Sequence, residues 1–193
     1  MSIIQVNGVA VDVTQTGTGR DLVLLHSLLA DRTAFDRVVP ALAKKHRVTL
    51  VNLPGYGESA PHGASVEEYA DHIAGLLRQL KLPRETDVLG NGLGGFIAIA
   101  LACRHGESFG KLFIADSLAT FPPAGKEPLR AMAERVKQQG MSAVLDAATS
   151  TVRVVSSIAC NPLAYAVTLA VLVVVFESVA VQVNIHTSLG SRR

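Results

Sequence analysis

The stretch that decides the fold is Asp87-Val-Leu-Gly-Asn-Gly-Leu-Gly-Gly-Phe96. Its pattern predicts a short buried strand over residues 87–89, a glycine-rich turn over 90–95 and an apolar helix over 96–103. Glycines at such a turn let a strand and the next helix pass closely. In a parallel sheet this turn lies at the carboxyl edge, where α/β folds bind their ligands. We therefore expect the functional site here.

Strand and helix patterns alternate along the rest of the first 150 residues. Apolar runs predict strands over residues 9–13, 22–25, 48–53, 87–89 and 111–115. Helical spacing predicts helices over residues 33–43, 66–80, 96–103 and 127–139. Ser65 and Glu68 form a capping box at the start of the second of these helices. Alternation of this kind predicts an α/β fold with a mostly parallel sheet.

Three motifs resemble segments of the α/β-hydrolase family. Leu24-Leu25-His26-Ser27-Leu28 resembles its oxyanion strand and loop, and Asn52-Leu-Pro-Gly-Tyr-Gly-Glu-Ser59 resembles the turn after its next strand. Asp31-Arg-Thr-Ala-Phe-Asp36 resembles the branch that holds 3-oxoadipate enol-lactonase and related esterases. The resemblance covers about residues 8–150. It implies a sheet of α/β-hydrolase type and hydrolysis of carboxylic esters or lactones through an acyl-enzyme.

The chain departs from the family at the nucleophile. The family's elbow is G-x-S-x-G, but here Gly92 stands where the serine belongs, among the elbow glycines Gly90, Gly94 and Gly95. Glycine tolerates the strained turn but has no atom with which to attack. Loss of the nucleophile from a triad enzyme costs on the order of 10⁶ in turnover. We therefore expect an inactive or strongly impaired hydrolase; the alternative is a non-catalytic pseudo-hydrolase that binds a small ligand.

The resemblance also implies which groups would bind a carbonyl oxygen. The backbone amides of Leu28 and Leu93 are the candidate oxyanion donors. His26 either orients the oxyanion loop or serves as a hydrogen-bonded histidine at the strand end. Ser27 belongs to the same candidate binding group, although Ser27 and Ser59 are each expected to be turn or capping serines rather than substitute nucleophiles.

Candidates for the other two triad members are sparse. Asp116 ends the predicted strand 111–115, where some branches of the family place the acid. His186 follows an alternating apolar run and is the candidate base. The family needs both groups from later strands, and no ordinary acid-loop-histidine segment follows.

A second interpretation of the same turn is a dinucleotide fingerprint. Gly90, Gly92 and Gly95 match G-x-G-x-x-G, and Asp116 lies 21 residues beyond Gly95, near the place of a ribose-binding acid. Two strand–helix units precede this turn, whereas the fingerprint usually belongs to the first strand of its domain.

The chain changes character near residue 150. Residues 1–150 carry the family pattern, whereas from residue 154 to 190 the single charged residue is Glu177. We expect a partial hydrolase core over 1–150 and an atypical apolar tail over 151–193. That tail is a packed element, a membrane segment through 154–183, or the product of truncation or a reading-frame change. A sheet left incomplete at its C-terminal side exposes an apolar edge, which predicts self-association.

Composition excludes several classes. A net charge of +2 over 193 residues argues against nucleic-acid partners, so the expected partner is a small-molecule ester or lactone. Two cysteines cannot form a disulfide framework, and no basic, apolar leader opens the chain, which favours the cytoplasm. Scattered histidines predict no metal, and no cofactor is expected. Cys103 is expected on the buried face of its helix.

Overall fold

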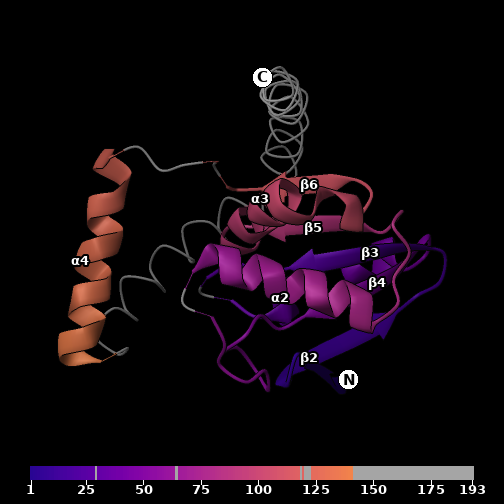
Figure 1. The fold of residues 1–193 in the computed structure, drawn as a ribbon, viewed down its shortest axis with the longest axis horizontal. Helices are drawn as coiled ribbons and strands as arrows, with labels where there is room; N and C mark the ends of the chain where they lie inside the picture. Colours follow the sequence, from indigo (N-terminus) through magenta and orange to yellow (C-terminus); the bar gives the residue numbers. More distant parts are fainter. Residues whose placement is uncertain (29, 64, 118, 120–122, 141–193) are drawn as a thin grey trace, which may run out of the picture. The chain divides into compact units, whose positions relative to one another are not determined.

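The computed structural model describes residues 1–28, 30–63, 65–117, 119 and 123–140. Contacts within the chain divide it into two units, residues 1–119 and 120–193. The first unit contains the sheet and its helices (Figure 1). In the second unit, the described element is helix α4, Pro123–Gln139, which confirms the helix predicted over 127–139.

Six strands form one mostly parallel sheet in the order β1-β2-β4-β3-β5-β6. The strands are β1 Ser2–Val6, β2 Val9–Thr16, β3 Arg20–Leu25, β4 His46–Val51, β5 Asp87–Asn91 and β6 Leu112–Ala115. β1, β2 and β4 pair antiparallel, whereas β4, β3, β5 and β6 pair parallel. This arrangement confirms the predicted fold class, and it adds β1, which the sequence did not predict.

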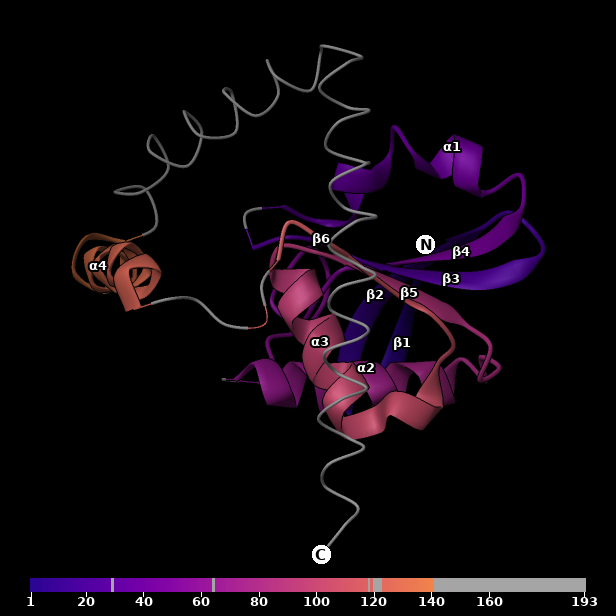
Figure 2. The ribbon, with the colours of Figure 1, turned by 90° about the horizontal axis from the view of Figure 1, so that it is seen from above.

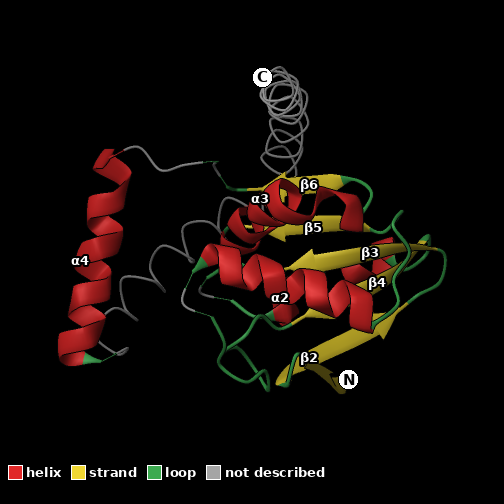
Figure 3. Ribbon diagram, viewed as in Figure 1, coloured by secondary structure: helices red, strands yellow, loops and turns green. Residues whose placement is uncertain are grey.

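Helices cover both faces of this sheet. α2, Val66–Gln79, and α3, Leu93–His105, lie on one face, and α1, Val39–Leu42, lies on the other (Figures 2 and 3). The single-turn helices are η1, Arg32–Phe35, and η2, Gly106–Ser108. Ser65 Oγ accepts a hydrogen bond from the Glu68 amide at 3.2 Å, which confirms the predicted N-cap of α2.

β3 is buried on both faces, as its solid apolar run predicts. Val23 and Leu25 point into the larger core, on the side of α2 and α3. Leu22 and Leu24 point into the smaller core, on the side of α1. The alternation follows from the two-residue period of a strand, and it leaves the end of β3 fixed between two packed layers.

The helix predicted over residues 33–43 is wrong. η1 ends at Phe35 and α1 begins at Val39, so the segment forms two short pieces. Pro40 lies in the first turn of α1, where its ring is tolerated, but in a continuous helix it would clash with the carbonyl four residues earlier. Asp31 caps η1 by accepting a hydrogen bond from the Thr33 amide at 2.8 Å.

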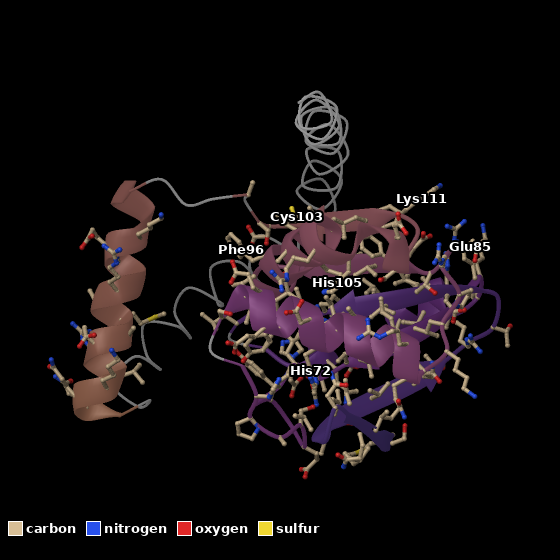
Figure 4. The ribbon with its side chains drawn as sticks, viewed as in Figure 1. His72, Glu85, Phe96, Cys103, His105 and Lys111 are labelled. Atoms are coloured by element: carbon tan, nitrogen blue, oxygen red, sulfur yellow. The ribbon has the colours of Figure 1, made fainter. Side chains whose placement is uncertain are left out.

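The buried position expected for Cys103 is also wrong. Cys103 is a free cysteine on the exposed side of α3 (Figure 4). The buried face of that helix instead carries Ile97, Ala98 and Leu101, at helical spacing. The helix is apolar nearly all round, and for that reason its composition did not indicate which side faces the sheet.

Consecutive charges on β3 pair with strands on opposite sides. Arg20 contacts the Asp87 carboxylate of β5 at 2.8 Å. Asp21 binds Arg47 of β4 through two hydrogen bonds of 2.6 and 2.9 Å. These pairs lie at the amino ends of the strands, away from the glycine-rich turn.

A buried polar cluster holds the residues that follow β4. Asn52 donates to the Asp12 carboxylate at 2.8 Å and accepts from the Arg32 amide at 2.9 Å. Ser59 Oγ accepts from the Asp12 amide at 2.8 Å and donates to the Asn52 carbonyl at 2.7 Å, as expected of a turn serine. The cluster joins β2, the β4 turn and η1.

Several expectations lie outside the described residues. These are the tail 151–193, the membrane segment through 154–183 and His186. Among the described helices, none is long and apolar enough to span a membrane.

Candidate active site

The glycine-rich turn forms a sharp bend between β5 and α3. β5 ends at Asn91 and α3 begins at Leu93, so Gly92 alone makes the turn, with φ 53° and ψ −114°. The Gly92 amide donates to the Ala115 carbonyl of β6 at 2.9 Å, and the Gly94 amide donates to the His26 carbonyl at 3.0 Å. The turn is therefore fastened to the strand on each side of it.

The other glycines of this turn are required by packing. A Cβ added at Gly94 would lie 2.8 Å from the Leu25 Cβ, and one added at Gly95 would lie 2.6 Å from the Ser117 Cβ. A Cβ at Gly90 would lie 2.7 Å from the Gly95 nitrogen. All three distances are too short for real carbon atoms, so only glycine permits this crossing of strand and helix.

Ser27 lies directly against the missing side chain of Gly92. A Cβ added at Gly92 would lie 2.9 Å from the Ser27 Cβ and would overlap the Ser27 hydroxyl. The hydroxyl must therefore turn away before position 92 can carry a side chain. Rotation of the hydroxyl does not move the Ser27 Cβ, whose position the backbone fixes, so the chain around Ser27 or Gly92 must also shift.

His26 is locked in one protonation state. Its Nε2 accepts a hydrogen bond from the Leu53 amide at 3.0 Å, so Nδ1 carries the proton and donates to the Ser27 carbonyl at 2.8 Å. Burial lowers the pKa of His26, which keeps the ring neutral. The ring also meets Tyr56 edge to face, with centroids 4.7 Å apart. Both nitrogens are engaged, so His26 orients the loop and is not free to act as a base.

The amides of Leu28 and Leu93 belong to two well-held peptide units. The Ser27–Leu28 unit has its carbonyl bound by His26, and Tyr56 Oη donates to the Leu28 carbonyl at 2.7 Å. The carbonyl of the Gly92–Leu93 unit accepts hydrogen bonds from Ser117 Oγ and from amides of the first turn of α3. Within the described part of the chain, neither Leu28 nor Leu93 donates its amide hydrogen to a backbone carbonyl.

Asp116 lies at the end of β6, next to the glycine turn along the sheet edge. It follows Ala115, which pairs with Asn91 and accepts from the Gly92 amide. Asp116 is exposed and has φ 51°, in the left-handed region that aspartate tolerates better than most residues. The structure thus brings the elbow glycines, residues 26–28 after β3 (the β3 loop) and Asp116 to the carboxyl edge of the sheet. His186 lies outside the described residues.

Sequence reasoning missed Ser117 and Tyr56. Tyr56 was visible in the Pro-Gly-Tyr-Gly turn, but its contact with Leu28 is made across 28 residues. Ser117 follows Asp116 at the strand end, which was the available signal for it. Among the described residues, no group of three or more His, Cys, Asp or Glu side chains could hold a metal ion.

Comparison with known proteins gives the family. The family model described as alpha/beta hydrolase fold matches residues 22–145. The chain therefore belongs to the α/β-hydrolase fold family, as the strand order and the elbow turn already indicate.

Three similar proteins illustrate the relationship. A pimeloyl-[acyl-carrier protein] methyl ester esterase of Aeromonas hydrophila is 37% identical over 115 residues, covering 58% of this chain and 43% of the esterase. A 2-hydroxymuconate semialdehyde hydrolase of Pseudomonas sp. strain CF600 is 34% identical over 122 residues, covering 60% and 43% of the two chains. The solved structure of a thermophilic esterase from Thermogutta terrifontis has a TM-score of 0.64 and 31% identity, covering 72% of this chain and 54% of that one. The chain thus spans less than half the length of these two curated relatives.

Proposed function

We propose that the chain binds small carboxylic esters or lactones at the edge of the sheet around Gly92, and that hydrolysis is lost or strongly impaired. The observation that carries this proposal is Gly92 itself. It occupies the strained turn between β5 and α3, where this family needs a nucleophile, and it has no side chain. The relatives named as esterases and hydrolases support the ligand class.

The two held peptide units support binding of a carbonyl oxygen. The amides of Leu28 and Leu93 would donate to that oxygen, as backbone amides do in an oxyanion hole. Ser27 lies directly against Gly92 and would contact the ligand. The motif at residues 31–36 favours a ligand like that of the 3-oxoadipate enol-lactonase branch.

Asp116 and His186 complete the proposal as the acid and base of a remnant triad. The position of Asp116 at the end of β6, beside the glycine turn, supports its role as the acid. His26 does not compete for the role of base because its two nitrogens are bonded to Leu53 and Ser27. If His186 does not reach the site, the protein is a pseudo-hydrolase that binds the ester or lactone without turnover.

Intact-mass labelling with a fluorophosphonate tests the proposal. Wild type and Gly92→Ala are expected to remain unlabelled, because neither carries a hydroxyl at position 92. Gly92→Ser takes up one label where the oxyanion site and a base survive, and none in a pure binding protein. A single label on wild type would contradict the proposal, because it would require an activated nucleophile elsewhere, and Ser27 would be examined first.

Dinucleotide binding is a second candidate, and one observation favours it. Asp116 ends the parallel strand next to β5, as a ribose-binding acid would. A ligand at 100 times its dissociation constant stabilises a protein by about 2.7 kcal/mol. Saturating NAD should therefore raise the melting temperature if this candidate is correct, and an unchanged melting temperature would exclude it.

A further inference from the structure

Ser117 is bonded to the same peptide unit that carries the Leu93 amide. Its Oγ donates to the Gly92 carbonyl, which also accepts from the Gly95 amide at 3.0 Å and the Phe96 amide at 3.2 Å. The carbonyl of Gly92 and the N–H of Leu93 lie on opposite sides of one planar peptide. A donor that fixes the direction of the carbonyl therefore also fixes the direction of the Leu93 amide.

Ser117 packs into a space beside Gly95. Gly95 has no side chain, and a Cβ there would lie 2.6 Å from the Ser117 Cβ, so the serine fills the space that the glycine leaves. The chain enters this position through Asp116, whose φ of 51° turns the backbone at the end of β6. A non-glycine residue in the left-handed region is uncommon, and such residues persist where surrounding contacts hold them, often at functional sites.

The same arrangement occurs at the other candidate donor. There, His26 Nδ1 donates to the Ser27 carbonyl, which shares a peptide unit with the Leu28 amide. Each candidate donor amide thus has a side-chain hydrogen bond on the carbonyl of its own peptide unit. A hydrogen bond to a carbonyl polarises the amide and strengthens the N–H as a donor.

We infer that Ser117 is a positioning residue of the site, acting through the Gly92 carbonyl to aim and polarise the Leu93 amide. This inference rests on the proposed function, because it assigns Ser117 to the same oxygen-binding site. Ser117 does not contact the ligand itself. Ser117 binds the Gly92 carbonyl at the β5–α3 turn, as His26 binds the Ser27 carbonyl after β3.

Nuclear magnetic resonance on the ¹⁵N-labelled full chain tests the inference, with butyrate as the probe. Ser117→Ala is compared with Ser117→Thr, which keeps the hydroxyl, and with Ser108→Ala, a serine-to-alanine control at η2. In Ser117→Ala, the Leu93 amide proton and nitrogen signals are expected to move upfield before butyrate is added. A Leu93 amide that is less polarised and less fixed in direction should bind butyrate more weakly, by about fivefold where the effect equals one net hydrogen bond. Ser117→Thr and Ser108→Ala should stay within about twofold of wild type.

Four outcomes decide between the alternatives. An unchanged Leu93 signal in Ser117→Ala would overturn the inference, whether or not butyrate binds. Equal loss in Ser117→Ala and Ser117→Thr would also overturn it, because packing against Gly95 would then explain the effect. If wild type does not bind butyrate, the oxygen-binding part of the proposed function fails, and the Leu93 signal still decides the role of Ser117. If Ser117→Ala does not fold, Ser117→Cys replaces it, and a smaller upfield shift from the weaker thiol donor supports the inference.

Discussion

Two turns at the carboxyl edge of the sheet are held in opposite ways. The glycine turn, residues 90–95, has its shape because three of its glycines lack the side chains that would collide with neighbouring strands and helices. The β4 loop, residues 52–63, has its shape because buried polar groups bind one another: the Asn52 side chain binds the Asp12 carboxylate, and Ser59 Oγ binds the Asp12 amide and the Asn52 carbonyl. The glycine turn thus depends on the absence of side chains, and the β4 loop depends on hydrogen bonds that side chains make.

The difference explains why the glycine turn does not depend on a side chain at position 92. No side chain at position 92 is needed to form the glycine turn, because backbone bonds to Ala115 and His26 hold it. The absence of a side chain at position 92 therefore leaves the packing of the turn intact. The β4 loop has no such tolerance, since its buried side chains Asn52 and Ser59 satisfy buried polar partners.

The largest expected effect comes from adding a methyl group to the glycine turn. In Gly94→Ala, the new Cβ would lie 2.5 Å from the Leu25 carbonyl carbon, so β3 and α3 must separate. We expect the free energy of unfolding to fall by about 3 kcal/mol. Urea denaturation measures it. Gly106→Ala is the matched control, because among the described atoms none lies within 4 Å of a Cβ added there. Equal stability of the two variants would show that glycine packing does not hold the turn.

A smaller loss is expected from the β4 loop. Asn52→Ala removes the bond to the Asp12 carboxylate and leaves both that carboxylate and the Arg32 amide short of a partner. Leaving buried polar groups unpaired predicts a loss of about 2 kcal/mol in the free energy of unfolding. Gln79→Ala, at the exposed end of α2, should change stability by less than about 0.5 kcal/mol. A neutral Asn52→Ala would mean that the loop is held by its backbone, as the glycine turn is.

Acid should destabilise the packing between α2 and the β4 loop. His72 of α2 is 2% exposed and packs against His62 of the loop, with ring centroids 5.0 Å apart. Burial, and to a lesser degree the neighbouring His62, lowers the pKa of His72 to about 4. A histidine whose pKa is depressed on folding is stable in its neutral form, so its contribution is complete above pH 6.5 and is lost between pH 6.5 and 4.

The predicted loss over that interval is roughly 1–2 kcal/mol after allowance for solvent screening. Unfolding free energies of wild type and His72→Leu, measured from pH 7.5 to 4, check it. The wild-type curve should fall more steeply below pH 6.5. Parallel curves for the two proteins would exclude His72 as the cause.

Local patterns predicted most of the architecture correctly. The capping box at Ser65 located the start of α2, and the uninterrupted apolar run of β3 indicated a strand buried on both faces. The helix over 33–43 failed because Pro40 outweighs helical periodicity. β1 was missed because Ser2–Val6 lies at the sheet edge and lacks a regular alternation.

The part of the candidate site that is contiguous in sequence was predicted. The glycine turn is contiguous in sequence, so its position between strand and helix was evident. The contacts of Ser117 with Gly92 and of Tyr56 with Leu28 join residues 25 and 28 positions apart. No period or spacing encodes such contacts, because they exist only when separate strands end at the same edge.

The opposite charges at the start of β3 bear on how the sheet is assembled. Arg20 faces β5 and Asp21 faces β4, and in the folded state such partly exposed pairs contribute little stability. If β3 slipped by one residue against β4, Arg20 would lie opposite Arg47, and Asp21 opposite the buried Val48. Parallel strands meet late and slowly during folding, and misaligned pairings compete with the correct one. The two charges thus destabilise misaligned pairings of β3 during folding, before the correct sheet has formed. Their effect is expected in the yield of correctly folded molecules.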